Sequence, residues 1–228
     1  MAEERLISLM GAIEQVGVWL SVLAWFSLVA GTMGMGYVLR KEKRRPVWGA
    51  AAIVGGVALV ANLADYFVTL SVSPDLSLEA NPLWRNVVGY FGLSVAKWYG
   101  LTGKIMISIL AGQLFAFYLA NRERLFPVRA GSVPQFLFRM GNRSRTLRER
   151  LMASFTVFAF FFAGVQFFSF YIAYLNWLVH SELRNHLPSV PVALFLCLCS
   201  LTVAFVAATY RGFVDSSPPH NVKISPDD

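Results

Sequence analysis

The chain has 228 residues, of which 56% are hydrophobic and only 14% are charged, and its formal net charge is +7. Soluble domains have a lower apolar fraction and a charged share of roughly 25%, so this composition excludes an ordinary soluble domain. The basic residues form two short blocks between apolar runs, which indicates membrane topology rather than a nucleic-acid-binding face.

Five apolar segments are each long enough to form a membrane-spanning helix, which needs about 20 residues to cross the hydrocarbon layer. The predicted spans are residues 16–39, 47–72, 97–119, 151–179 and 190–210. They predict an all-α, multi-pass transmembrane bundle of five spans that forms a single domain, residues 1–212. Residues 213–228 are polar and proline-rich, which is typical of a disordered tail.

The third apolar run covers residues 87–120 and is too long for one simple span. We therefore expect a bend at one of its glycines, with residues 87–96 lying at the interface or re-entering the membrane. The candidate positions are Gly89, Gly92, Gly100 and Gly103.

Lysine and arginine predict the orientation, because cytosolic loops are enriched in both. Residues 40–46, residues 121–150 and the C-terminal tail carry 15 of the 20, whereas the loops on the opposite side carry three. We therefore expect the N-terminus outside and the C-terminus in the cytosol. The lipid bilayer is the first expected partner, and no nucleic acid is expected.

The larger basic loop contains a candidate interfacial helix at residues 134–150. Such a helix buries its apolar face at the headgroup boundary while its arginines meet anionic lipid. The arginines assigned to the cytosolic lipid surface are Arg139, Arg143 and Arg150, and the apolar face comprises Phe136, Leu137, Met140, Leu147 and Leu151. The alternative is a solvated basic loop that only follows the positive-inside rule.

Ionisable side chains are costly in hydrocarbon, so Asp65, Lys97 and Lys104 are candidate functional residues. Asp65 lies about eight residues before the outer end of the second span, and Lys97 lies about ten residues into the third apolar run from the same side. The matching depths predict an Asp65–Lys97 ion pair, with the deeper Lys104 as the alternative partner. The pair either only locks two helices together or serves transport or catalysis.

The outer turn after the second span contains Glu79, Asn81 and Pro82. Proline fixes its own φ and biases the preceding asparagine toward extended geometry, while asparagine and glutamate side chains can cap the start of a helix. Helix capping is therefore the first interpretation for Asn81, and capping and chemistry are equally open for Glu79.

This order of residues resembles the pattern of a family of small bacterial and archaeal membrane proteins known as a domain of unknown function. That pattern has an Asp-x-x-x-Thr helix, a Glu-x-Asn-Pro turn and a downstream lysine, and the resemblance covers about residues 58–110. It implies no activity, and it favours a prokaryotic cytoplasmic (inner) membrane. The residues that it groups into one polar constellation are Asp65, Thr69, Glu79, Asn81, Pro82 and either Lys97 or Lys104.

The fourth span carries a polar stripe at helical spacing, formed by Gln166, Ser169 and Asn176. Hydrogen bonds and small residues hold membrane helices together, because there is no hydrophobic drive between helices in lipid. The stripe therefore predicts a face that packs against protein, either within the bundle, in a homo-oligomer or against another membrane protein.

The sequence offers no recognisable catalytic, cofactor or metal site. The histidines at positions 180, 186 and 220 fall outside the spans, which excludes a pair of haem ligands within the membrane. The C-x-C pair, Cys197 and Cys199, suits neither a zinc site nor a redox pair.

These observations leave three hypotheses for function. The first is a non-enzymatic subunit, scaffold or accessory factor of a membrane complex. The second is a small-solute, ion or proton transporter with a polar path through Asp65 and Lys97. The third is a membrane hydrolase or transferase that uses Glu79 as an acid or base.

Overall fold

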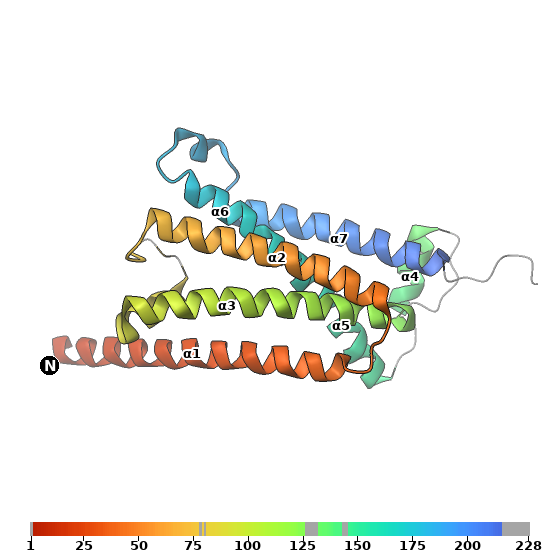
Figure 1. Ribbon diagram of the computed structural model, residues 1–228, viewed down its shortest axis with the longest axis horizontal. Helices are drawn as coiled ribbons and strands as arrows, with labels where there is room; N and C mark the ends of the chain where they lie inside the picture. Colours follow the sequence, from red (N-terminus) through yellow and green to blue (C-terminus); the bar gives the residue numbers. More distant parts are fainter. Residues whose placement is uncertain (1, 78, 80, 126–131, 143–145, 216–228) are drawn as a thin grey trace, which may run out of the picture.

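The structure is a computed structural model that describes residues 2–77, 79, 81–125, 132–142 and 146–215. These residues form a bundle of long helices and contain no strand (Figure 1). Five helical segments are long and apolar enough to cross a membrane. The predicted fold class, a multi-pass helical membrane protein with five spans, is therefore confirmed.

The helices and short 3-10 segments follow one another in chain order. Their bounds are α1 (Ala2–Leu39), α2 (Arg45–Val72), α3 (Pro82–Leu125), α4 (Val133–Asn142), α5 (Leu147–Val165), η1 (Gln166–Phe168), α6 (Ser169–Trp177), η2 (Glu182–His186) and α7 (Val190–Asp215). The candidate spans at Val16–Leu39 and Val190–Tyr210 coincide with the predicted first and fifth spans. Because α7 continues to Asp215, residues 213–215 are helical, and the rest of the predicted tail lies outside the described residues.

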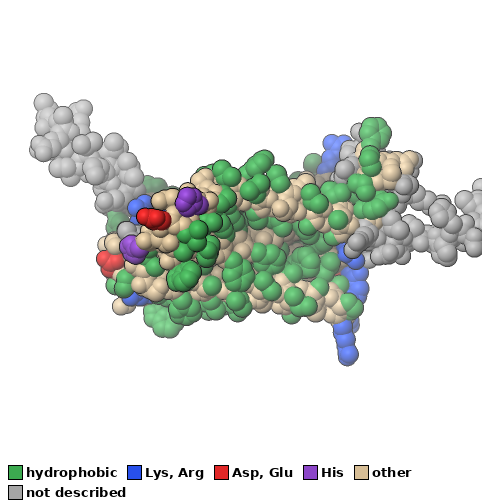
Figure 2. All heavy atoms as spheres, turned by 90° about the horizontal axis from the view of Figure 1, so that it is seen from above, with side chains coloured by type: hydrophobic (Ala, Val, Ile, Leu, Met, Phe, Trp, Pro, Cys, Tyr) green, Lys and Arg blue, Asp and Glu red, His purple; other side chains and the backbone are tan. Residues whose placement is uncertain are grey.

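The two ends of the bundle differ in charge. The end with residues 40–44 is called the basic end. The opposite end, with residues 73–77, 79, 81 and 178–189, contains a cavity and is called the pocket end. On the face shown in Figure 2, hydrophobic side chains cover the middle of the bundle and Lys and Arg are prominent at the basic end. This is the pattern of a protein whose middle section lies in lipid.

Helices α2 and α3 form the centre of the bundle: α3 packs against α1, α2 and α5, and α2 also packs against α6. Where they cross, a Cβ added to Gly112 would lie 2.9 Å from the carbonyl oxygen of Ala51 and 3.3 Å from the Cα of Gly55. Two backbones can approach this closely only where side chains are absent. The crossing sets the antiparallel register of α2 and α3, and with it the depth of every polar residue nearer the pocket end.

The long helix α3 bends at Gly92, whose φ of 82° and ψ of 167° lie outside the helical region. Glycine adopts this positive φ without steric cost. Residues 82–91 fold back along the next turns of α3, since the indole nitrogen of Trp84 donates to the carbonyl oxygen of Ala96 at 2.6 Å. The Trp84 ring also lies directly against Gly100. Gly92 therefore permits the bend, whereas Gly100 permits the close approach of Trp84.

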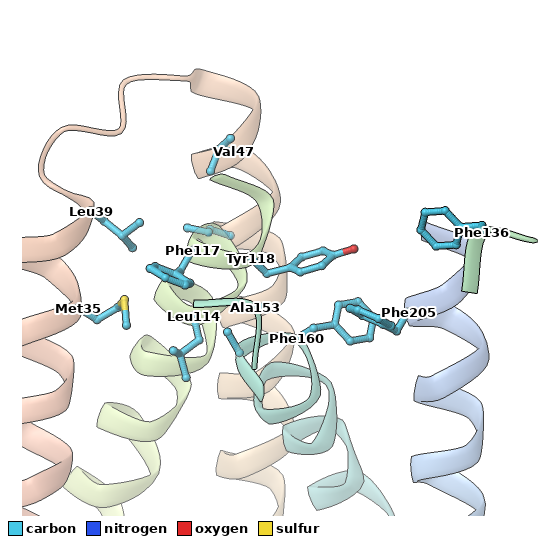
Figure 3. Close-up of a cluster of buried hydrophobic side chains, with 13 residues drawn as sticks. Met35, Leu39, Val47, Leu114, Phe117, Tyr118, Phe136, Ala153, Phe160 and Phe205 are labelled. Carbon is cyan, nitrogen blue, oxygen red and sulfur yellow. The ribbon is translucent and has the colours of Figure 1, made fainter. Parts of the chain in front are cut away.

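An aromatic cluster packs the basic end of the bundle. Tyr118 of α3 and Phe160 of α5 meet with ring centroids 5.0 Å apart, and Phe160 also meets Phe205 of α7 at 5.3 Å. Figure 3 shows these rings pointing toward one another, with Phe136 of α4 beyond them. The Tyr118 hydroxyl lies 3.2 Å from the Thr209 hydroxyl, which adds a buried hydrogen bond between α3 and α7.

The predicted interfacial helix at residues 134–150 was wrong in its extent. Helix α4 ends at Asn142, and α5 begins at Leu147 behind a capping box in which Thr146 and Glu149 exchange hydrogen bonds. Arg150 is exposed and belongs to α5, so it does not share a helix with Arg139. Arg143 and the side chain of Arg139 lie outside the described residues.

The apolar face predicted for this segment is also divided. Phe136 is buried against Tyr210 of α7, with ring centroids 5.7 Å apart, whereas Leu147 and Leu151 are exposed on α5. The ring of Phe136 therefore contributes to the bundle core rather than to the headgroup boundary.

Candidate functional site

A cavity of about 550 Å³ lies at the pocket end between α2, α3 and α6. Clefts of this size hold small-molecule ligands in other proteins. The lining residues come from five separate parts of the chain and are Asp65, Thr69, Val72, Ser73, Glu79, Asn81, Trp84, Lys104, Ile172, Asn176, Val179 and Arg184. The cavity thus brings together most of the polar constellation that the sequence grouped.

An ion pair between α2 and α3 contributes to the cavity wall. Lys104 Nζ lies 2.6 Å from Asp65 Oδ2, and the side chains of Lys104 and Asp65 are 24% and 12% exposed. The predicted Asp65–Lys97 pair was wrong, and Lys104, the alternative partner, is the one in contact. Lys97 is half-buried on α3, and its carbonyl oxygen accepts a hydrogen bond from the Tyr66 hydroxyl at 3.1 Å.

The Asp65–Lys97 prediction assumed that the third apolar run is one straight helix, so that residue number gives depth in the membrane. The bend at Gly92 moves the start of the span, and the register of the Gly55–Gly112 crossing brings Lys104 opposite Asp65. Lys97 lies seven residues earlier, about 10 Å nearer the pocket end at the helical rise. The Lys97 ammonium therefore lies nearer the end of the bundle and does not require Asp65 as a counter-charge.

Asn176 of α6 completes the surroundings of the ion pair. Its amide nitrogen lies 3.4 Å from Asp65 Oδ1 and donates to the Thr69 hydroxyl at 3.2 Å. The Asp65 carboxylate is thus approached by Lys104 on one oxygen and by Asn176 on the other. Such neighbours reduce the cost of a charge within a membrane bundle.

A second polar layer lies beneath the ion pair, toward the basic end. Asn62 of α2 donates to the Ser108 hydroxyl of α3 at 3.2 Å, and its amide oxygen accepts from Ser169 of α6 at 3.0 Å. Asn62 and Ser108 are almost completely buried. This layer ties α2, α3 and α6 together.

The three residues of the polar stripe in the fourth span form two kinds of hydrogen bond. Ser169 and Asn176 bond across to α2, whereas the amide nitrogen of Gln166 donates to the Phe162 carbonyl oxygen of the preceding helical turn at 3.3 Å. Gln166 is buried. All three side chains face protein, and only Asn176 reaches the cavity.

The turn at Glu79–Pro82 is built as a helix cap. Asn81 Oδ1 accepts from the Leu83 N–H at 3.0 Å, Glu79 Oε1 accepts from the Asn81 N–H at 2.7 Å, and Pro82 is the first residue of α3. Asn81 therefore occupies the N-cap position that suits its side chain. Because Glu79 and Asn81 also line the cavity, capping and a place in the site occur together.

The preceding residues hold the loop against the bundle. Hydrogen bonds from the backbone and hydroxyl of Ser77 lower the pKa of Asp75 below its usual value, which favours a charged carboxylate that orders the loop. Leu76 has a φ of 60° and is buried with Tyr66 and Trp84. A leucine holds this left-handed conformation only where its surroundings compensate the strain.

The sequence did not single out six of the lining residues, which are Val72, Ser73, Trp84, Ile172, Val179 and Arg184. Arg184 belongs to η2 in the connection between α6 and α7, and in the sequence it bears only on the charge asymmetry of the loops. It is the one Lys or Arg in residues 178–189, which is the feature that could have singled it out. Trp84 reaches the cavity only because residues 82–91 fold back at Gly92.

The lining can bind a charged or polar molecule, since it combines two carboxylates and two basic groups with apolar side chains. No three His, Cys, Asp or Glu side chains of the described residues come together as a metal site would require. Comparisons of the chain with models of protein families, with curated proteins and with solved structures gave no match. The family resemblance of residues 58–110 therefore rests on the motif residues alone.

Proposed function

We propose that this integral membrane protein binds a small polar solute in the cavity at the pocket end. The main observation behind the proposal is that Asp65, Glu79, Asn81, Lys104 and Asn176, from four separate parts of the chain, line one cavity. Charged residues within a membrane bundle are expensive, and they are a hypothesis for a functional site by default.

The geometry favours solute binding over a subunit or scaffold role, which was the first hypothesis from the sequence. A scaffold needs packed helices but no polar cavity of about 550 Å³. The ion pair alone could serve only to join α2 and α3, yet Lys104 is 24% exposed and borders the cavity. The Lys104 ammonium is therefore within reach of a solute in the cavity, which a fully enclosed ion pair would not be.

A binding assay on the purified full-length protein tests this function. Amino acids, sugars, carboxylates and nucleosides would be screened for a rise in melting temperature in detergent, because a ligand that binds only the folded state stabilises it. We expect one solute class to stabilise the protein and the charge-neutral double variant Asp65→Asn, Lys104→Met to lose that response. Lys97→Met is the matched control and keeps it.

Two results would contradict the proposal. The first is a screen in which no solute class raises the melting temperature. The second is a response that the Asp65→Asn, Lys104→Met protein retains, since binding would then lie elsewhere.

We further propose that the pocket end faces the outside and the basic end the cytosol. The 15-to-3 asymmetry of Lys and Arg supports this orientation. Single cysteines placed in a Cys197→Ala, Cys199→Ala background would be labelled in intact cells with a membrane-impermeant reagent. We expect labelling at position 77 and none at position 43, and the reverse pattern would overturn the orientation.

Flux through the protein decides between a transporter and a receptor. The solute identified by thermal stabilisation would be supplied to proteoliposomes at the pocket face. Accumulation above that of empty liposomes indicates transport, whereas binding without accumulation indicates a sensing or delivery role.

A further inference from the structure

The charges around the cavity indicate what kind of solute it takes, given the proposed function. Two acidic residues, Asp65 and Glu79, and two basic residues, Lys104 and Arg184, line it. Their formal charges balance. Adding a net anion or a net cation to this partly enclosed space would leave an uncompensated charge, whereas a molecule with one charge of each sign would not.

The basic groups have hydrogen-bonding capacity left for a ligand. A lysine ammonium has three N–H donors, and the one partner of the Lys104 ammonium within the described residues is Asp65. Arg184 forms no ion pair within the described part of the chain, and its guanidinium offers five donors in a fork that suits a carboxylate. Lys104 and Arg184 are therefore suited to receive an anionic group.

Asp65 is less available than Lys104. One of its oxygens contacts Lys104 and the other faces Asn176, and its side chain is only 12% exposed. Glu79 lines the cavity from a different segment, the turn before α3, where its carboxylate supplies negative charge. Because both oxygens of Asp65 already face Lys104 and Asn176, we assign a cationic group on the ligand to the other carboxylate of the lining, that of Glu79.

Apolar side chains complete the lining. Val72 of α2, Trp84 of α3, Ile172 of α6 and Val179 offer hydrophobic surface beside the charged groups. A ligand that carried only its two charges would leave this surface without a partner, and an aliphatic or aromatic substituent would cover it.

We propose that the cavity binds a zwitterionic amino acid with an apolar side chain. Its carboxylate contacts Lys104 and Arg184, its ammonium contacts Glu79, and its side chain packs against Trp84 and the neighbouring aliphatic residues. The proposal rests on the proposed function and names the substrate class of the same site.

Three related compounds test this on the full-length protein in detergent: L-leucine, leucinamide, which lacks the carboxylate, and 4-methylpentanoate, which lacks the ammonium. We expect L-leucine to bind at least about tenfold more tightly than either analogue, because each analogue leaves a charged group of the cavity without its partner. Equal affinity for L-leucine and either analogue would overturn the inference, and this comparison needs no variant.

Variants then assign the two ends of the ligand. Glu79→Gln keeps an oxygen that can accept from the Asn81 N–H, so we expect it to fold and to weaken L-leucine binding without changing the binding of 4-methylpentanoate. Arg184→Gln should weaken both. Arg85→Gln is the matched control, because Arg85 is exposed at the start of α3 and does not line the cavity. An unchanged affinity of Glu79→Gln for L-leucine would overturn the assigned orientation of the ligand.

The outcomes separate this inference from the proposed function. If a sugar or nucleoside stabilises the protein in a Lys104-dependent way while L-leucine does not, the substrate class is wrong and solute binding stands. If no compound of any class binds, both are wrong.

Discussion

The two halves of the bundle are held together by different interactions. At the basic end, aromatic rings from α3, α5 and α7 pack within 5.0 to 6.0 Å of one another. At the pocket end, a charged pair, two asparagines and several hydroxyl groups join α2, α3 and α6, and a cavity of about 550 Å³ remains between them.

The difference shows how a small membrane protein can divide stability from function. Close packing of large side chains is favourable in lipid because it replaces looser contacts with acyl chains. Buried charges bring little net stability even when they are well paired. The aromatic half is therefore expected to contribute more to the stability of the bundle than the ion pair and hydrogen bonds that surround the cavity.

The largest expected effect comes from breaking the aromatic half. Phe160→Ala removes a ring that contacts Tyr118 and Phe205, and it should lower the free energy of unfolding by about 3 kcal/mol. Phe158→Ala on the same helix is the control, because Phe158 is 52% exposed. Denaturation in detergent measures both, and equal losses for the two variants would show that the cluster has no special role.

The ion pair should have the next largest effect. Asp65→Ala leaves Lys104 without its counter-charge, and since Lys104 is partly exposed we expect a loss of about 2 kcal/mol rather than the full cost of a buried charge. Adding Lys104→Met should restore much of the stability, whereas adding Lys97→Met should not. A rescue by Lys97→Met would mean that the wrong lysine has been assigned.

The contact between Trp84 and Gly100 is expected to stabilise the packing of residues 82–91 in the polar half. A Cβ at Gly100 would overlap the Trp84 ring, whereas a Cβ at Gly103 would meet nothing within 4 Å. Gly100→Ala should therefore be less stable than Gly103→Ala by about 1.5 kcal/mol, although alanine favours the helix at both positions. Thermal unfolding of the two variants gives the difference directly, and identical melting temperatures would contradict the packing of residues 82–91.

The smallest expected effect concerns the cap. Asn81→Ala removes the acceptor for the Leu83 N–H and should cost about 1 kcal/mol. Asn81→Asp keeps an oxygen acceptor and should retain most of that stability. If Asn81→Asp is as destabilised as Asn81→Ala in chemical denaturation, the amide itself has a role that capping does not explain.

Local sequence patterns were sufficient for much of the fold and part of the site. The apolar runs predicted five spans because the thickness of the bilayer sets the length of a helix. Asn81 before Pro82 predicted a helix start, since capping depends on residues only a few positions apart. Asp65, Glu79 and Asn81 line one cavity because a short turn between antiparallel helices keeps its neighbours at one end of the bundle.

The tertiary structure decided which groups touch. The Gly55–Gly112 crossing and the bend at Gly92 set the register that pairs Asp65 with Lys104, and neither the crossing nor the bend angle can be calculated from residue type. Arg184 lines the cavity from the connection after α6, which is distant in the chain from α2 and α3. The local sequence determines where a helix begins and ends and which side chains lie on each of its faces. Which other helix those side chains contact depends on segments that are distant in the chain, and these contacts exist only once the bundle has formed.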